Sequence, residues 1–164
     1  MPRKYLLAGA IAVVGVLAVG VPIAGAAEGT ATTRPGARTI TCSIMTYNQT
    51  PNQLSGFTFG YISCPKPFGN GVQSGTYSVT VTATGAVIQK GTFTSWFDTG
   101  TTHGTYSLIG RYTSATAATF KGTATDTGGT GAFRRINATG PLTCSTTDAG
   151  AASTCTRVAT LSGL

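Results

Sequence analysis

Few side chains in this sequence can carry out acid–base, nucleophilic or metal chemistry. The 164 residues hold four acidic side chains, Glu28, Asp98, Asp126 and Asp148, and one histidine, His103. So few carboxylates leave little room for a hydrolase built on a carboxylate pair, and a single histidine excludes a multi-histidine metal site. Serine, histidine and aspartate all occur, but no G-x-S-x-G element marks a catalytic serine. The sequence therefore predicts no metal and no cofactor, and it leaves open whether the protein is an enzyme.

Asp98 is one candidate for chemistry because it follows two aromatic residues, Trp96 and Phe97. A carboxylate that aromatic side chains shield from water could serve as an acid catalyst or contact a ligand. The alternative, which the sequence Asp98-Thr99-Gly100 favours, is an aspartate that caps a turn.

Arg111 and Tyr112 form a second candidate, because an arginine beside a tyrosine could bind an anionic or phenolic ligand through charge-assisted hydrogen bonds. The alternative is a surface arginine whose stem packs on a neighbour. Aromatic residues of the strand-like segments could line a cavity, although filling a core is their usual role. The candidate ligand-binding residues are Tyr61, Phe93, Asp98, Tyr106, Arg111, Tyr112 and Phe120.

The four cysteines, Cys42, Cys64, Cys144 and Cys155, predict two disulfides. Four cysteines allow three connectivities. Cys144 and Cys155 flank a polar loop and would staple it, which leaves Cys42 to pair with Cys64. A zinc site is the alternative, but the sequence has no C-x-x-C pair and no nearby histidine.

The N-terminus has the pattern of a secretory signal peptide over residues 1–27. Arg3 and Lys4 precede an apolar run that ends in small residues, which favours cleavage over an uncleaved membrane anchor. Removing these two basic residues lowers the net charge from +7 to +5. The remaining basic residues are scattered, so the sequence predicts no nucleic-acid partner. We expect a secreted, extracellular protein with no stable membrane anchor after cleavage.

After a polar linker at 28–38, the chain has the pattern of an all-β domain over residues 39–164. Short β-branched or aromatic runs alternate with glycine-containing turns, and no segment has a helical period. The predicted strands cover residues 39–46, 57–63, 76–83, 86–94, 103–111, 117–126, 132–139 and 155–161. One face of these strands is apolar and the other is rich in threonine, which is typical of antiparallel sheets. Closing eight strands into an up-and-down barrel removes the sheet edges, although a β-sandwich is the rival.

The segment 104–140 contains GTYSLIG followed by GGTGAF at 128–133. This segment resembles dirigent proteins and allene oxide cyclases, which carry a similar G-G-[ST]-G-x-F element near the C-terminus. The resemblance implies an eight-stranded antiparallel barrel and a homo-oligomer, since the family forms dimers and trimers. The glycines of this element would allow close chain approach, and Phe133 would point inward and plug one end. No catalytic residue is transferred, because a shared fold does not establish a shared function.

Two functional hypotheses remain. The first is a secreted barrel that binds a small apolar or phenolic ligand and, if it is catalytic, steers the reaction of this ligand by confinement, as dirigent proteins and cyclases do. The second is a non-enzymatic extracellular interaction or surface module with a solid barrel, whose loops at 65–74 and 145–154 make the contacts.

Overall fold

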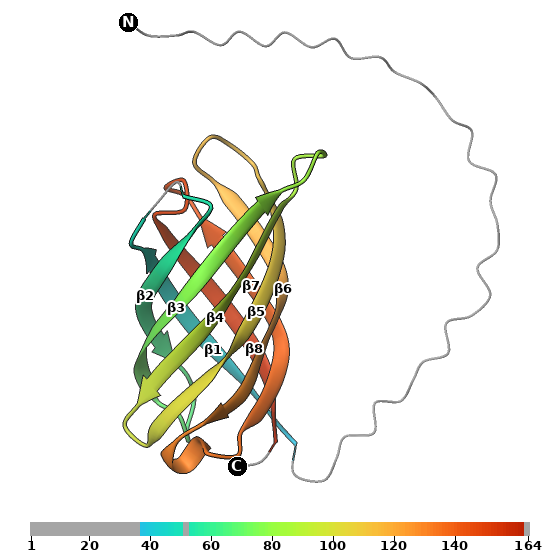
Figure 1. The fold of residues 1–164 in the computed structure, drawn as a ribbon. Helices are drawn as coiled ribbons and strands as arrows, with labels where there is room; N and C mark the ends of the chain where they lie inside the picture. The colour runs from blue at the N-terminus through green and yellow to red at the C-terminus, as the bar shows by residue number, and fades with distance from the viewer. Residues whose placement is uncertain (1–36, 51–52, 163–164) are drawn as a thin grey trace, which may run out of the picture. The chain divides into compact units, whose positions relative to one another are not determined.

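The computed structural model describes residues 37–50 and 53–162, so the predicted signal peptide at 1–27 lies outside the described residues. These residues form a closed antiparallel barrel in which each strand pairs with the next and β8 pairs with β1 (Figure 1). This confirms the predicted barrel and excludes the sandwich. Within the described ranges, no helix is long and apolar enough to cross a membrane. The elements are β1 (Arg38–Asn48), β2 (Ser55–Ser63), β3 (Asn70–Val81), β4 (Val87–Phe97), β5 (Gly100–Tyr112), β6 (Ala118–Gly129), the short 3-10 helix η1 (Gly131–Phe133), β7 (Asn137–Thr146) and β8 (Ala152–Ser162).

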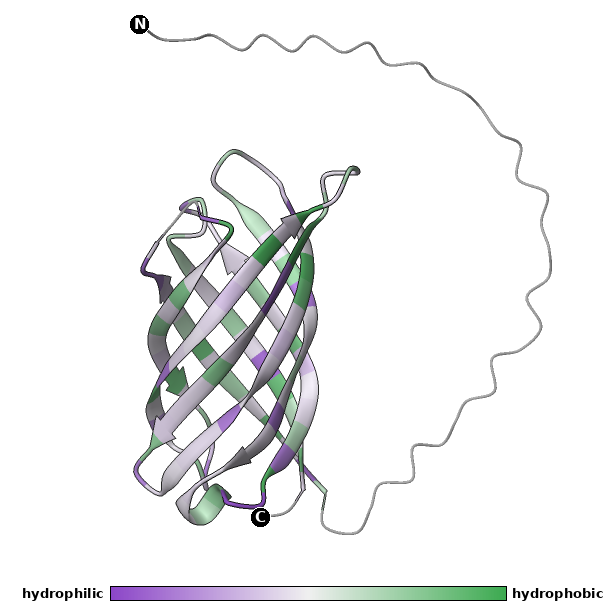
Figure 2. Cartoon of the chain, viewed as in Figure 1, coloured by the Kyte–Doolittle hydropathy of each residue, from purple (hydrophilic) through white to green (hydrophobic). Residues whose placement is uncertain are grey.

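Side chains along each strand point alternately into the barrel, whose inside we call the lumen, and outward from its wall. In β5, Leu108 is buried while Thr105 and Ser107 are exposed, as the sequence predicts. Buried residues of every strand except β3 form one hydrophobic cluster inside the barrel, and the half-buried Val79 of β3 packs against it. Figure 2 shows the resulting change between hydrophilic and hydrophobic residues along the strands. The outward positions are mostly threonine and serine, which suit a β-strand that faces water.

Several strand boundaries differ from the prediction, including the starts of β3 and β7. β3 begins at Asn70 rather than at residue 76, so the second half of the predicted loop at 65–74 is strand. Glycine and asparagine in this stretch suggest a turn, but a Cβ atom at Gly71 would lie 2.3 Å from the carbonyl oxygen of Trp96. Glycine is therefore needed here for close packing of the strands rather than for a turn. β7 begins at Asn137 rather than at residue 132, because the chain first forms η1.

One end of the barrel, here called the closed end, is filled by three aromatic side chains. Phe133 from η1 is fully buried and stacks on Phe68, with 4.5 Å between the ring centroids. Phe97 packs against both rings edge-on. This confirms the prediction that Phe133 plugs one end. The turn before it requires glycine, because Gly131 has a φ of 58° and its Cβ atom would lie 2.4 Å from the Thr99 oxygen.

Both predicted disulfides are present. Cys144 and Cys155 are direct partners in the β7–β8 pairing, and Cys42 of β1 bonds to Cys64, the residue that follows β2. The loop that Cys144–Cys155 staples is shorter than predicted, since β7 continues to Thr146 and β8 starts at Ala152. Two disulfides are consistent with an extracellular protein.

Candidate ligand site in the barrel lumen

The end of the barrel opposite the aromatic plug is open and leads into the lumen. This opening, here called the mouth, has a volume of about 200 Å³, and the lumen below it has a cavity of about 60 Å³. Asn48, Gln89, Phe120 and Ser153 line both spaces, so the mouth continues into the lumen. A molecule could therefore enter from solvent without any opening of the sheet.

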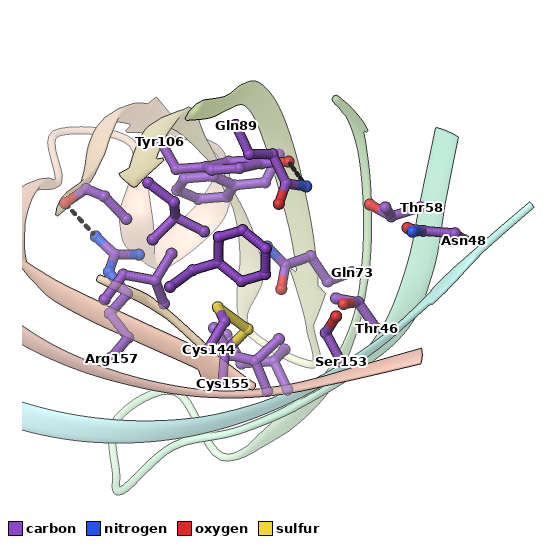
Figure 3. Close-up of a pocket in the computed structure, with 17 residues that line it drawn as sticks. Thr46, Asn48, Thr58, Gln73, Gln89, Tyr106, Cys144, Ser153, Cys155 and Arg157 are labelled. Atoms are coloured by element: carbon purple, nitrogen blue, oxygen red, sulfur yellow. Dashed lines mark hydrogen bonds between the residues drawn. A yellow bond between two sulfur atoms is a disulfide. The ribbon is translucent and has the colours of Figure 1, made fainter. Parts of the chain in front are cut away.

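The wall of the lumen is largely apolar. Its apolar side chains come from six different strands, because every strand directs alternate residues inward. The disulfide Cys144–Cys155 forms part of the same wall (Figure 3). The other apolar lining residues are Ile44, Ile62, Phe93, Leu108, Phe120, Ala124 and Leu142.

Tyr106 and Gln89 place a hydrogen-bonded pair in this wall. The Gln89 amide donates to the Tyr106 hydroxyl over 3.3 Å (Figure 3). The Tyr106 hydroxyl in turn donates to the Thr76 carbonyl over 3.4 Å. Burial raises the pKa of Tyr106 from 10.0 to about 12, although the hydrogen bond from Gln89 partly offsets this effect. The phenol is therefore neutral and able to donate a hydrogen bond at physiological pH.

A buried ion pair lies deeper in the lumen, toward the closed end. Arg157 Nη2 donates to Asp126 Oδ2 over 2.5 Å, and the two side chains are only 7% and 4% exposed. The same nitrogen lies 3.3 Å from the Ala138 carbonyl, and the guanidinium carbon lies 5.4 Å from the centre of the Phe93 ring. The positive charge is therefore balanced within the barrel.

Two buried side-chain atoms in the described ranges have no hydrogen-bond partner, Gln73 Oε1 and Arg157 Nε. Both residues line the lumen cavity. Figure 3 shows Gln73 near the middle of the cavity and Arg157 on its far side. Unpaired buried polar atoms are rare in folded proteins and each costs about 1–3 kcal/mol. The wall of the lumen thus holds one acceptor and one donor without a partner.

The structure brings together only part of the predicted ligand-binding set. Phe93, Tyr106 and Phe120 line the lumen, and Tyr112 lines the mouth. Whether these four residues contact a ligand stays a prediction. The remaining three predicted residues lie outside this site.

Tyr61, Asp98 and Arg111 do not line the lumen or the mouth, and whether they contact a ligand stays a prediction. Tyr61 is 61% exposed because it alternates with Ile62, and Ile62 takes the inward position. Asp98 is exposed in the turn between β4 and β5 at the closed end. Arg111 is exposed because it lies two residues after the outward-facing Ile109 in β5 and therefore also points outward.

The polar residues that were missed at the sequence level include Gln73, Gln89 and Arg157 of the lumen, and Asp126, which pairs with Arg157. A signal was available for Arg157, which shares its parity with Cys155, Ala159 and Leu161 in β8. A charged residue on the apolar face of a strand must be paired or functional. Gln73 was hidden because its segment was assigned to a loop.

The fold and this site define a class of protein: a disulfide-stapled, closed antiparallel barrel with one plugged end and one open end. Comparison of the chain with known protein families, with curated proteins and with solved structures gives no match. The resemblance to dirigent proteins and allene oxide cyclases is not tested by these comparisons and stays a prediction.

Proposed function

We propose that the lumen binds a small, neutral, mostly apolar molecule that carries a hydroxyl group, such as a phenol. The observation that carries this proposal is the pair of unpartnered buried atoms in one cavity, Gln73 Oε1 and Arg157 Nε. A hydroxyl group can donate to the glutamine oxygen, and an acceptor elsewhere on the molecule can take the Arg157 N–H. The apolar wall would hold the rest of the molecule.

The size and charge of the site narrow the ligand class. The spaces of about 60 Å³ and 200 Å³ are smaller than the roughly 300–1,000 Å³ of a pocket for drug-sized ligands. A molecule with a single ring is therefore favoured. Since Asp126 already balances Arg157, the site needs no anionic ligand.

A chemical role would follow the mechanism that the family resemblance implies. The lumen would hold a reactive molecule in one conformation, so that an intramolecular or coupling step gives one product. Orientation alone can supply several kcal/mol without a strong acid or base. This mechanism suits a lumen whose only buried acid, among the described residues, is already paired with an arginine.

The second candidate function is a non-enzymatic extracellular interaction module. It is favoured by a different observation, the exposed aromatic side chains on the outer wall. This function does not depend on the lumen and would tolerate a ligand-free barrel.

The experiment compares 4-ethylphenol with ethylbenzene, which has the same apolar body without the hydroxyl group. We expect saturable binding by isothermal titration calorimetry, with a Kd at least tenfold lower for the phenol, because the hydroxyl satisfies a buried acceptor. Gln73→Leu is expected to remove this preference. Gln49→Leu is the matched control, since Gln49 is exposed and lies outside both spaces, and it is expected to keep the preference.

Equal affinity for the two compounds in the wild-type protein would refute the role of the hydroxyl group. Absence of saturable binding of both compounds would refute the lumen site as a whole. Thermal unfolding of each variant establishes that the barrel remains folded.

A further inference from the structure

The outer wall of β1–β4 carries a continuous group of exposed apolar side chains that the lumen does not use. We call this group the aromatic band. Phe57 is 65% exposed and Trp96 is 42% exposed, although both could have been threonine, as at most outward positions. Soluble proteins rarely expose a contiguous apolar surface of more than a few hundred Å² without a function. The aromatic band consists of the exposed residues Met45, Phe57, Phe59, Tyr61, Val72 and Trp96, together with the half-buried Tyr47 that stacks on Phe59.

Strand register aligns these residues in rows across the barrel wall. Met45 pairs with Tyr61, Tyr61 with Val72, and Val72 with Trp96, so one row crosses four strands. The backbones of Tyr61 and Trp96 are two strands apart, which corresponds to roughly 10 Å. The smaller Val72 lies between them. In the adjacent row Tyr47 pairs with Phe59, and their rings stack with 5.5 Å between centroids.

The rows next to the aromatic band are polar and uncharged, and the exposed Lys66 and Asp98 lie in the connections that follow β2 and β4. The next row outward consists of Ser43, Ser63 and Asn70, and the Ser63 hydroxyl donates to Asn70 over 2.8 Å. Ser74 and Thr94 continue the row of Phe59. The other exposed basic residues of the sheet are Arg38 at the start of β1 and Lys90, Arg111 and Lys121 on β4–β6. In a basic protein, this segregation favours a neutral partner over an acidic one.

We propose that the aromatic band binds a neutral, extended polysaccharide chain. The faces of aromatic rings carry partial negative charge, and the C–H groups on one face of a pyranose ring carry partial positive charge. In an extended β-1,4-linked chain every second sugar presents the same face in the same direction. Aromatic residues two strands apart, as Tyr61 and Trp96 are, therefore suit two sugars of such a chain. Neighbouring hydroxyl and amide groups would bond to the sugar hydroxyls.

A second copy of the protein is the less favoured occupant. Taking about 200 Å² for one aromatic side chain, the four rings of Phe57, Phe59, Tyr61 and Trp96 expose roughly 400 Å². A stable protein interface buries about 800 Å² on each partner. Two convex barrel walls meet over a narrow area, whereas a single polysaccharide chain needs only the width of one row of side chains.

Trp96 allows a direct test because it is the single tryptophan of the chain. We expect cellohexaose or chitohexaose to reduce acrylamide quenching of its fluorescence at least twofold, in a saturable manner. Tyr61→Ser, which keeps the fluorescent probe, is expected to raise the Kd at least tenfold. Ile109→Ser is the matched control, because Ile109 is an exposed outward residue of β5, is 56% exposed and lies outside the band. It is expected to leave the Kd unchanged.

The outcomes separate this proposal from the lumen site, because a phenol bound in the lumen does not cover an outward-facing ring. Absence of protection by either oligosaccharide, or an equal loss in both variants, would overturn the proposal. Sedimentation velocity distinguishes the other occupant. The wild-type protein could form a dimer that the Tyr61→Ser substitution dissociates and that the oligosaccharide leaves intact. This result would show that the aromatic band binds a second copy of the protein, and it would also overturn the polysaccharide proposal.

Discussion

The ion pair between Asp126 and Arg157 permits the sharpest test of how the lumen is built. Asp126→Asn keeps the size of the side chain but removes the negative charge. The guanidinium of Arg157 then stays in a barrel where its side chain is only 7% exposed, with carbonyl oxygens and the Phe93 ring as its remaining neighbours. Removing one partner of a buried ion pair costs about 3–5 kcal/mol, because the other charge is left uncompensated.

This loss is a large share of the roughly 5–15 kcal/mol that stabilises a typical domain. We expect the free energy of unfolding of Asp126→Asn to fall by about 3–5 kcal/mol. The double variant Asp126→Leu with Arg157→Met is expected to recover most of this loss, because well-packed apolar residues often replace a buried ion pair at little cost. Asp98→Asn makes the same chemical change at an exposed turn and should remain within about 0.5 kcal/mol of wild type.

Urea unfolding with both disulfides intact, followed by circular dichroism and by the fluorescence of Trp96, measures these differences. A loss below about 1 kcal/mol in Asp126→Asn, similar to that in Asp98→Asn, would refute the reasoning. It would mean that water reaches the guanidinium through the mouth and solvates it. The lumen would then be wet down to Arg157, and an apolar ligand would have to displace this water.

Two further predictions concern the walls of the barrel. Replacing Cys144 and Cys155 by alanine should lower the free energy of unfolding by about 3 kcal/mol in urea titrations, since the bond closes an 11-residue separation; an unchanged midpoint would contradict this. Tyr106 should ionise only near pH 12 in an absorbance titration at 295 nm, and Tyr106→Phe should remove this late step. The pKa of Tyr106 is higher in the folded than in the unfolded protein, so the stabilisation by the neutral phenol is complete below pH 10. This stabilisation, roughly 2–3 kcal/mol, is lost as the pH rises toward 12. Ionisation of Tyr106 near pH 10 would instead show that the ring is solvated.

The barrel could be predicted from the sequence because its strands are short, numerous and regularly alternating. Tyr77 and Val79 point into the barrel from β3, as their spacing of two residues indicates. The start of β3 could not be predicted, because the sequence alone does not distinguish a glycine in a turn from a glycine in a strand that packs closely against its neighbour. Gly75 is of the second kind, since its Cβ atom would lie 2.2 Å from the carbonyl oxygen of Thr92 on the neighbouring strand.

The polar part of the site depends on register and closure, which a single sequence does not contain. Asp126 and Arg157 are 31 residues apart and lie on β6 and β8, with β7 between them. Their contact requires that both face inward at the same height of the barrel. The alternation of side chains along each strand predicts that both residues face inward. Their common height in the barrel is set only by the pairing of β7 with its two neighbouring strands.

The chemistry of the lumen is better explained by binding than by stability. A buried ion pair adds little net stability compared with apolar residues of the same volume, and the unpartnered atoms of Gln73 and Arg157 are a further cost. A barrel selected only for stability would fill this space with aliphatic side chains, as the closed end is filled by Phe68 and Phe133. The two ends of the same barrel thus differ in construction: one is packed with rings, and the other leaves a mouth that leads to polar atoms without partners. This difference within one molecule supports a lumen that accepts a ligand from the open end.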